Sequence, residues 1–219
     1  MKRLFWIVPV LLLACMSMVS CSESDDSVEE FVDWKARNEA FFNTKMDFAL
    51  AAIAEAKRTY GDDWEAHCDW RTFLSYSLEP GTGTKRTDSI CVEIVRRGTG
   101  VTQPLVTDSV RMNYRGRLIP STSYADGMVF DHSGQYTDFD RVFDRASAAP
   151  VMFRVGSLAR GIGTALLYMR KGDLWRVFVP SDLAYGRSGV QKVPGYSTLV
   201  FEMDLVEHYR AGTIPPVWS

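Results

Sequence analysis

A tyrosine at the end of a strand-like stretch is the first candidate for chemistry in this sequence. Residues 174–186 begin with the alternation of bulky side chains that is typical of a strand, and the pattern breaks at Pro180. Tyr185 stands directly before Gly186, so we expect its phenol on a loop that a strand holds in place. A phenol in that position can donate a hydrogen bond to a bound ligand.

Other kinds of catalytic site are not indicated. The three histidines, His67, His132 and His208, lie in separate predicted elements and therefore predict no metal site. The spacing of a Ser-His-Asp triad or of a phosphate-binding loop does not occur. The formal net charge is −2, whereas a nucleic-acid-binding domain is usually strongly basic. We therefore expect no metal, no cofactor and no nucleic-acid partner.

The first 20 residues have the pattern of a secretory signal. Two basic residues precede an apolar run over residues 4–14, which is shorter than the ~20 residues that a membrane span needs. Residues 18–21, Met-Val-Ser-Cys, resemble a bacterial lipobox; residues 12–15 are a second match that would leave a very short apolar region. We expect cleavage before Cys21, acylation of Cys21 and anchoring in a lipid membrane.

Residues 21–27 form a short acidic segment without large apolar side chains, which predicts a flexible tether. Beside an acylated cysteine such a run resembles the surface-export signal of Bacteroidetes lipoproteins, and a simple solvated linker fits equally well. We expect an exported, membrane-anchored lipoprotein, at the periplasmic face of the outer membrane or at the cell surface.

Two cysteines remain beyond the tether, Cys68 and Cys91. In an oxidising compartment they could form a disulfide that joins the helical segment to the first strand of the main domain. Two separately buried thiols fit the sequence equally well.

Helical spacing of apolar residues runs from Val28 to Tyr60 and predicts one long amphipathic helix, or two in line. Ser27, with Glu30 three residues later, resembles a capping box at its start. Residues 62–78 are rich in aromatic side chains and predict a short second helix that packs against the first. The long helix could also join two copies of the chain in a homodimer.

From residue 90 the pattern changes to the alternation of strands. The predicted strands are 90–95, 110–118, 129–131, 151–155, 175–179 and 198–206. Only residues 158–169 keep helical spacing, so we expect an α+β fold in which one helix lies on a face of an antiparallel sheet. The chain then divides into a signal peptide (1–20), a tether (21–27), a helical accessory segment (28–80), a main domain (88–210) and a C-terminal tail (211–219).

Four stretches of the main domain, taken in order, resemble the FKBP-type peptidyl-prolyl cis-trans isomerases. They are 110–116, 127–133, 151–161, and 180–186 with 198–201. The resemblance implies a curved half-barrel of antiparallel strands around one short helix, with an apolar pocket between them. The residues that it places in this pocket are Tyr114, Phe130, Asp131, Phe153, Leu158, Ala159, Ile162, Tyr185 and Phe201.

The implied activity is isomerisation of X-Pro bonds in exported polypeptides. The barrier of ~18–20 kcal/mol comes from amide resonance, so a dry apolar pocket that favours the twisted amide lowers it without covalent chemistry. By resemblance, the Tyr185 hydroxyl and the Ala159 N–H donate to substrate carbonyls. Asp131 would orient Tyr114 or an arginine of the following loop; the alternative is an Asx turn at the end of a strand.

The sequence also departs from the family pattern. Ile162 stands where most active members carry a tryptophan, and Val151 replaces another aromatic wall residue. We therefore expect a shallower pocket and weak activity, and the alternative function is a proline-peptide-binding or chaperone lipoprotein with little turnover. Residues 134–150 form a long loop that could cover the pocket or pack its own aromatic side chains.

Overall fold

The computed structural model describes residues 29–134 and 149–218 of the chain. Within this part, seven strands form one antiparallel sheet in the order β1-β2-β6-β7-β3-β4, and β5 also pairs with β3. The strands are β1 Trp70–Leu74, β2 Ser89–Arg96, β3 Ser109–Arg117, β4 Val129–His132, β5 Val151–Arg154, β6 Leu174–Val179 and β7 Leu199–Tyr209. The six predicted strands are confirmed, with ends that differ by a few residues.

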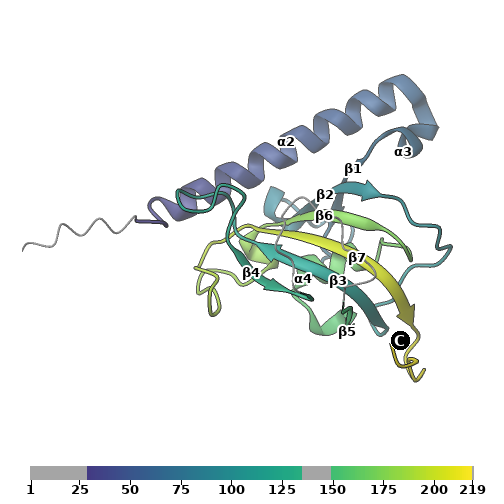
Figure 1. Cartoon of the computed structure of the whole chain (residues 1–219). Helices are drawn as coiled ribbons and strands as arrows, with labels where there is room; N and C mark the ends of the chain where they lie inside the picture. Colours follow the sequence, from purple (N-terminus) through teal and green to yellow (C-terminus); the bar gives the residue numbers. More distant parts are fainter. Residues whose placement is uncertain (1–28, 135–148, 219) are drawn as a thin grey trace, which may run out of the picture.

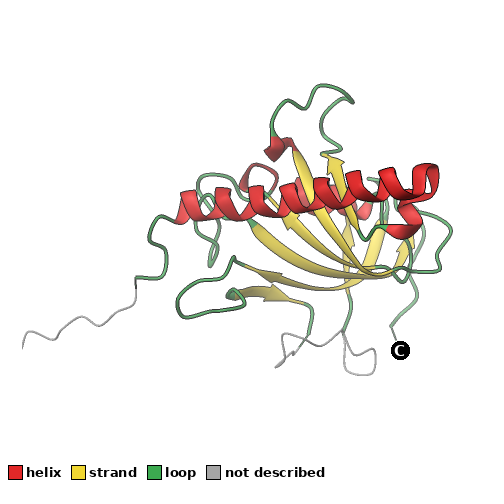
Figure 2. Cartoon of the chain, turned by 90° about the horizontal axis from the view of Figure 1, so that it is seen from above, coloured by secondary structure: helices red, strands yellow, loops and turns green. Residues whose placement is uncertain are grey.

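The two longer helices lie on opposite faces of this sheet (Figures 1 and 2). The described helices are α2 Trp34–Tyr60, α3 Trp64–His67 and α4 Arg160–Leu166. Four 3-10 turns accompany them: η1 Gly61–Asp63, η2 Arg86–Asp88, η3 Val155–Ser157 and η4 Ser181–Leu183. The prediction of a helix up to Tyr60 is confirmed as a single helix, and the helix predicted at 158–169 is confirmed in a shorter form.

The strands alternate between the two faces, as the period of two requires. In β6, Val177 and Val179 belong to the apolar cluster that includes Ile162 of α4, whereas Phe178 packs with Phe42 of α2. We call the first face concave and the second convex, because the sheet curves around α4 (Figure 1). The predicted α+β architecture is therefore confirmed.

The capping box predicted at Ser27 and Glu30 is wrong. The helix begins at Trp34 after Asp33, and no side chain caps it. Ser27 lies outside the described residues, and the Glu30 carboxylate instead accepts hydrogen bonds from the Ser121 hydroxyl and the Ser123 N–H. Glu30 therefore connects the segment before α2 to the loop that follows β3 through hydrogen bonds.

The second helix predicted over 62–78 is also wrong for most of its length. Only α3 is α-helical, after the 3-10 turn η1, and β1 pairs with β2 in the sheet. Trp70 stacks on Phe178 of the convex face, while Phe73 stacks on Trp175 of the concave cluster. The aromatic residues of this segment therefore alternate between two faces, which is the pattern of a strand and not of a helix.

Cys68 and Cys91 are free, buried thiols in this structure, so the disulfide is not formed. The register pairs Thr72 with Cys91, four residues beyond Cys68. At ~3.3 Å per residue this offset is about 13 Å along the strand, well beyond the separation that a disulfide bridges. Burial raises the pKa of the Cys91 thiol to about 12.

The C-terminal tail lies against β3. Arg111 donates a hydrogen bond to the carbonyl of Pro216, and its guanidinium lies 5.4 Å from the centre of the Trp218 ring. Within the described residues, no helix is both long and apolar enough to cross a membrane.

Candidate functional site

The end of β6 positions Tyr185. Pro180 ends the strand, and its carbonyl accepts the N–H of Leu183 in the turn η4. Gly186 follows with a φ of 64°, a conformation that glycine adopts without steric cost. The Tyr185 side chain is consequently held on a short turn, with 38 % of its surface exposed.

The second group of the site is the carboxylate of Asp131 on β4. Tyr114 of β3 donates a hydrogen bond from its hydroxyl to Asp131 Oδ2, at 3.0 Å. The other oxygen of Asp131 accepts the backbone N–H of His132 at 2.9 Å. Each oxygen of the carboxylate therefore accepts one hydrogen bond. Arg141 and Arg145, the arginines of the following loop, lie outside the described residues.

Both tyrosine hydroxyls are held in the neutral form. Burial, followed by the charge of Asp131, raises the pKa of Tyr185. Burial, together with the hydrogen bond to Asp131, raises the pKa of Tyr114. Within the described part of the chain, no acceptor is bonded to the Tyr185 hydroxyl.

Aromatic pairs build the apolar wall beside these groups. The rings of Tyr114 and Phe153 meet edge to face at 5.5 Å, and those of Phe130 and Phe201 at 5.6 Å. Gly116 lies beneath the second pair, and a Cβ there would come within 2.5 Å of the Phe130 ring. The close approach of Phe130 to the sheet therefore requires a glycine at this position of β3.

The start of α4 supplies a backbone donor. Ala159 is the N-cap residue, and no described acceptor is bonded to its N–H. Leu158 and Ala159 are partly buried against the main core, and Ile162 is buried in it. The nine residues expected in the pocket thus come from β3, β4, β5, β7, α4 with the two residues before it, and the turn after β6.

The hollow between these groups is small, about 150 Å³. Its lining residues are Phe130, Asp131, Tyr185, Val190, Gln191, Lys192 and Val193. Three of the nine expected residues line it, and the other six belong to the main core or pack against it. Sequence reasoning missed residues 190–193; the signal that could have found them is their position in the loop that follows Tyr185.

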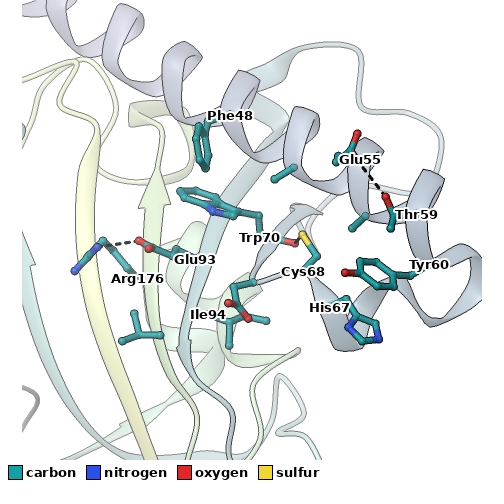
Figure 3. A pocket seen from close by; sticks show the side chains of 14 residues that line it. Phe48, Glu55, Thr59, Tyr60, His67, Cys68, Trp70, Glu93, Ile94 and Arg176 are labelled. Carbon is teal, nitrogen blue, oxygen red and sulfur yellow. Dashed lines mark hydrogen bonds and ion pairs between the residues drawn. The ribbon is translucent and has the colours of Figure 1, made fainter.

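A larger groove of about 790 Å³ lies on the convex face, between α2 and the edge formed by β1 and β2 (Figure 3). Its carboxylates are neutralised by arginines: Glu55 pairs with Arg58, Asp69 with Arg97, and Glu93 with Arg176. In the described ranges, no three metal-ligating side chains come together. The carboxylates of the groove are therefore already paired with arginines.

Residues 100–206 match the profile of the family described as FKBP-type peptidyl-prolyl cis-trans isomerase. A macrophage infectivity potentiator of Trypanosoma cruzi is 33% identical over 137 residues, which cover 62% of this chain and 61% of that protein. The FKBP-type isomerase FkpA of Escherichia coli K12 is 33% identical over 185 residues, 84% of this chain and 57% of the relative. The outer membrane protein MIP of Legionella longbeachae is 30% identical over 180 residues, which cover 82% of this chain and 62% of that protein. The chain thus spans about three fifths of the length of these relatives.

Proposed function

Because residues 100–206 are a domain of the FKBP-type peptidyl-prolyl cis-trans isomerase family, we propose that this protein catalyses rotation about X-Pro bonds of polypeptides at the concave pocket. The observation that carries the proposal is the neutral Tyr185 hydroxyl, which has no described acceptor and faces the Asp131 side of an aromatic wall. A donor of this kind can hold a substrate carbonyl while the amide twists.

In the proposed mechanism, the proline ring of the substrate enters beside Phe130 and loses its contact with water. The twisted amide is less polar than the planar one, so removal of water favours the transition state over the ground state. Tyr185 donates to one substrate carbonyl and the Ala159 N–H to a neighbouring one. Asp131 holds the Tyr114 ring against Phe153 and so keeps the wall in place. The protein forms no covalent bond to the substrate.

A second candidate is a proline-peptide-binding or chaperone protein with little turnover. Ile162 in place of the usual tryptophan and the small hollow of about 150 Å³ favour it, because drug-sized ligand sites usually enclose ~300–1,000 Å³. A shallow pocket holds the proline ring but excludes less water from the amide.

The test is an isomerisation assay on an X-Pro peptide with the unmutated chain, Tyr185→Phe, Asp131→Ala and a control, Tyr168→Phe. Tyr168 is exposed, and its ring stacks on Phe73 away from the pocket. We expect catalysis above the thermal rate in the unmutated chain and in the control, and a loss of about 10-fold or more in the two site variants. Peptide binding with no acceleration would favour the second candidate, and neither binding nor acceleration would refute both.

We also propose that the protein is exported and anchored through acylated Cys21. The lipobox-like residues 18–21 support this, and the acidic tether would then space the domain from the membrane. Cys21→Ala is expected to release the protein from membranes, whereas the matched Cys15→Ala leaves it bound. Unchanged retention of Cys21→Ala would contradict acylation at that residue.

A homodimer through α2 is a further part of this proposal. Phe31, Val32 and Leu50 are exposed apolar side chains of α2 and the turn before it, and they could pack against a second copy. Sedimentation of the full chain in detergent is expected to give a dimer, and Leu50→Glu is expected to shift it toward monomer. A monomer at high concentration would contradict the proposal.

A further inference from the structure

The first turn of α2 contacts the loop that carries one wall of the candidate site. Residues 186–198 connect Tyr185 to β7, and residues 190–193 of this loop line the small hollow. The loop closes on itself, because the Tyr196 N–H donates to the carbonyl of Gly186 at 2.9 Å. The position of Tyr196 therefore determines the position of the residue next to Tyr185.

Three hydrogen bonds join this loop to the helix. The indole N–H of Trp34 donates to Ser197 Oγ at 2.9 Å. Asn38 Oδ1 accepts the N–H of Thr198 at 2.7 Å, and the backbone carbonyl of Asn38 accepts the Thr198 hydroxyl at 3.1 Å. These bonds link residues 160 or more positions apart in the chain.

The groups that make these bonds are out of contact with water. Trp34 is 7% exposed and Asn38 is 1% exposed, and Ser197 and Thr198 are each 3% exposed. Asn38 Nδ2 donates to the Trp34 carbonyl at 2.7 Å, which fixes the orientation of the amide so that Oδ1 faces Thr198. Because a buried donor or acceptor without a partner is costly, displacement of the loop from this position is unfavourable.

Backbone strain is concentrated at the same junction. Within the described residues, three non-glycine residues have a positive φ: Asp33 at 50°, Gln191 at 45° and Tyr196 at 62°. Asp33 precedes Trp34, and the other two belong to the loop. Lys35 Nζ lies 5.1 Å from the centre of the Tyr196 ring, so the helix also holds that side chain. Strained residues persist where surrounding contacts over-determine the conformation.

We propose that Trp34 and Asn38 are positioning residues of the isomerase site, which hold loop 186–198, and with it Tyr185 and residues 190–193, in the geometry that a prolyl peptide requires. This rests on the proposed function of the concave pocket. In this account the start of α2 acts on the site through directional bonds, while the rest of the helix only covers the sheet.

The test compares Asn38→Ala with Met46→Ala in the full chain. Met46 is buried in the apolar cluster between α2 and the sheet and has no hydrogen bond to the loop, so its truncation destabilises the same helix without touching the junction. At a temperature where both variants are folded, we expect Asn38→Ala to lower kcat/KM for an X-Pro peptide by about 10-fold, because small displacements of a site cost at least this much. Met46→Ala is expected to stay within about 2-fold. Equal kcat/KM values in the two variants would overturn the proposal.

Ser197→Ala is the milder second variant if Asn38→Ala does not fold. It removes one hydroxyl, which accepts the Trp34 indole N–H and donates to the Pro194 carbonyl within the loop. A loss of about 3-fold in kcat/KM is expected, and Ser197→Ala combined with Trp34→Phe should lose less than the product of the two single losses, because both changes remove the same bond. Additive losses would contradict a shared role.

A readout that needs no activity separates this proposal from the proposed function. Hydrogen exchange of the Val193 and Tyr196 amides reports the order of the loop directly. We expect exchange of both amides to be at least about 10-fold faster in Asn38→Ala than in Met46→Ala. If the unmutated chain does not catalyse isomerisation, the proposed function fails, and the same exchange difference still supports or, if missing, refutes the positioning role.

Discussion

The two faces of the sheet are built from alternate residues of the same strands, yet they are filled in opposite ways. On the concave face, Leu199, Met203 and Leu205 of β7 are fully buried in one apolar cluster. On the convex face, Glu202 of the same strand lies among three arginines and is almost as deeply buried. One face is therefore held by packing, and the other partly by charges that have lost their water.

This difference explains why the smaller hollow is the better candidate for catalysis. The concave hollow combines the Phe130 ring with the Tyr185 hydroxyl and the Asp131 carboxylate, which accepts the Tyr114 hydroxyl. The convex groove of Figure 3 is larger, but its carboxylates are satisfied by arginines. Preorganised hydrogen-bond donors, and not volume alone, indicate chemistry.

The largest effect should come from the convex charges. Glu202→Gln removes the carboxylate that lies between Arg115, Arg117 and Arg176, and loss of one partner from a buried ion pair typically costs ~3–5 kcal/mol. We expect a decrease of that size in the free energy of unfolding by urea.

The control for this change is Glu207→Gln, at an ion pair with the exposed Lys171, which should cost about 1 kcal/mol or less. Equal losses for the two variants would show that the convex network contributes no more than surface pairs.

A smaller loss is expected from overpacking the concave face. Gly161 of α4 faces β6, and a Cβ there would lie 2.3 Å from a methyl group of Val179. Gly161→Ala should therefore lower stability by roughly 1–3 kcal/mol, although alanine favours a helix. Combined with Val179→Ala, which makes room, the loss should be less than the sum of the two single losses, as measured in a double-mutant cycle of urea unfolding. Strict additivity would contradict the close contact of α4 with the sheet.

The sequence predicted most helices and strands, but not the contacts between segments that are far apart in the chain. The alternation of side chains in the strands and the helical spacing after residue 158 predicted the sheet and α4, because each is a local pattern. The bonds of Trp34 and Asn38 to residues near 198 could not be predicted, since nothing local in either segment encodes a contact across 160 positions. The strand β1 was missed because its aromatic residues pack on both faces, and single-sequence periodicity cannot tell this from a helix over so short a stretch.

A third effect is a pH dependence confined to the concave face. Tyr114 and Tyr185 have a pKa above the ordinary value of 10.0 in the folded protein, so the folded state keeps these protons when the unfolded chain releases them. Their contribution to stability is complete below pH 10 and decreases as the pH rises further. Urea unfolding between pH 9 and 11 should show a weaker decrease in Tyr114→Phe than in the exposed control Tyr168→Phe. The same decrease in both variants would contradict the burial of Tyr114.

The smallest effect is a labelling rate on the convex face. Cys91 lies under α2 with a pKa near 12, so its thiol should be alkylated only when the helix detaches. In a Cys68→Ser chain, we expect Met46→Ala to speed labelling of Cys91 and Asn38→Ala to speed it less. Rapid labelling of the unmutated site would show that α2 does not cover this face in solution.

The most direct test of the account is a titration of ¹⁵N-labelled protein with a short Leu-Pro peptide, followed by NMR with exchange spectroscopy on the peptide. We predict shifts at the amides of Asp131, Ala159 and Tyr185, none at Phe48 and Trp70 of the convex groove, and cis-trans exchange of the peptide faster than in buffer. Shifts confined to the convex groove, or a peptide that binds at neither face, would contradict the assignment of the site to the concave pocket.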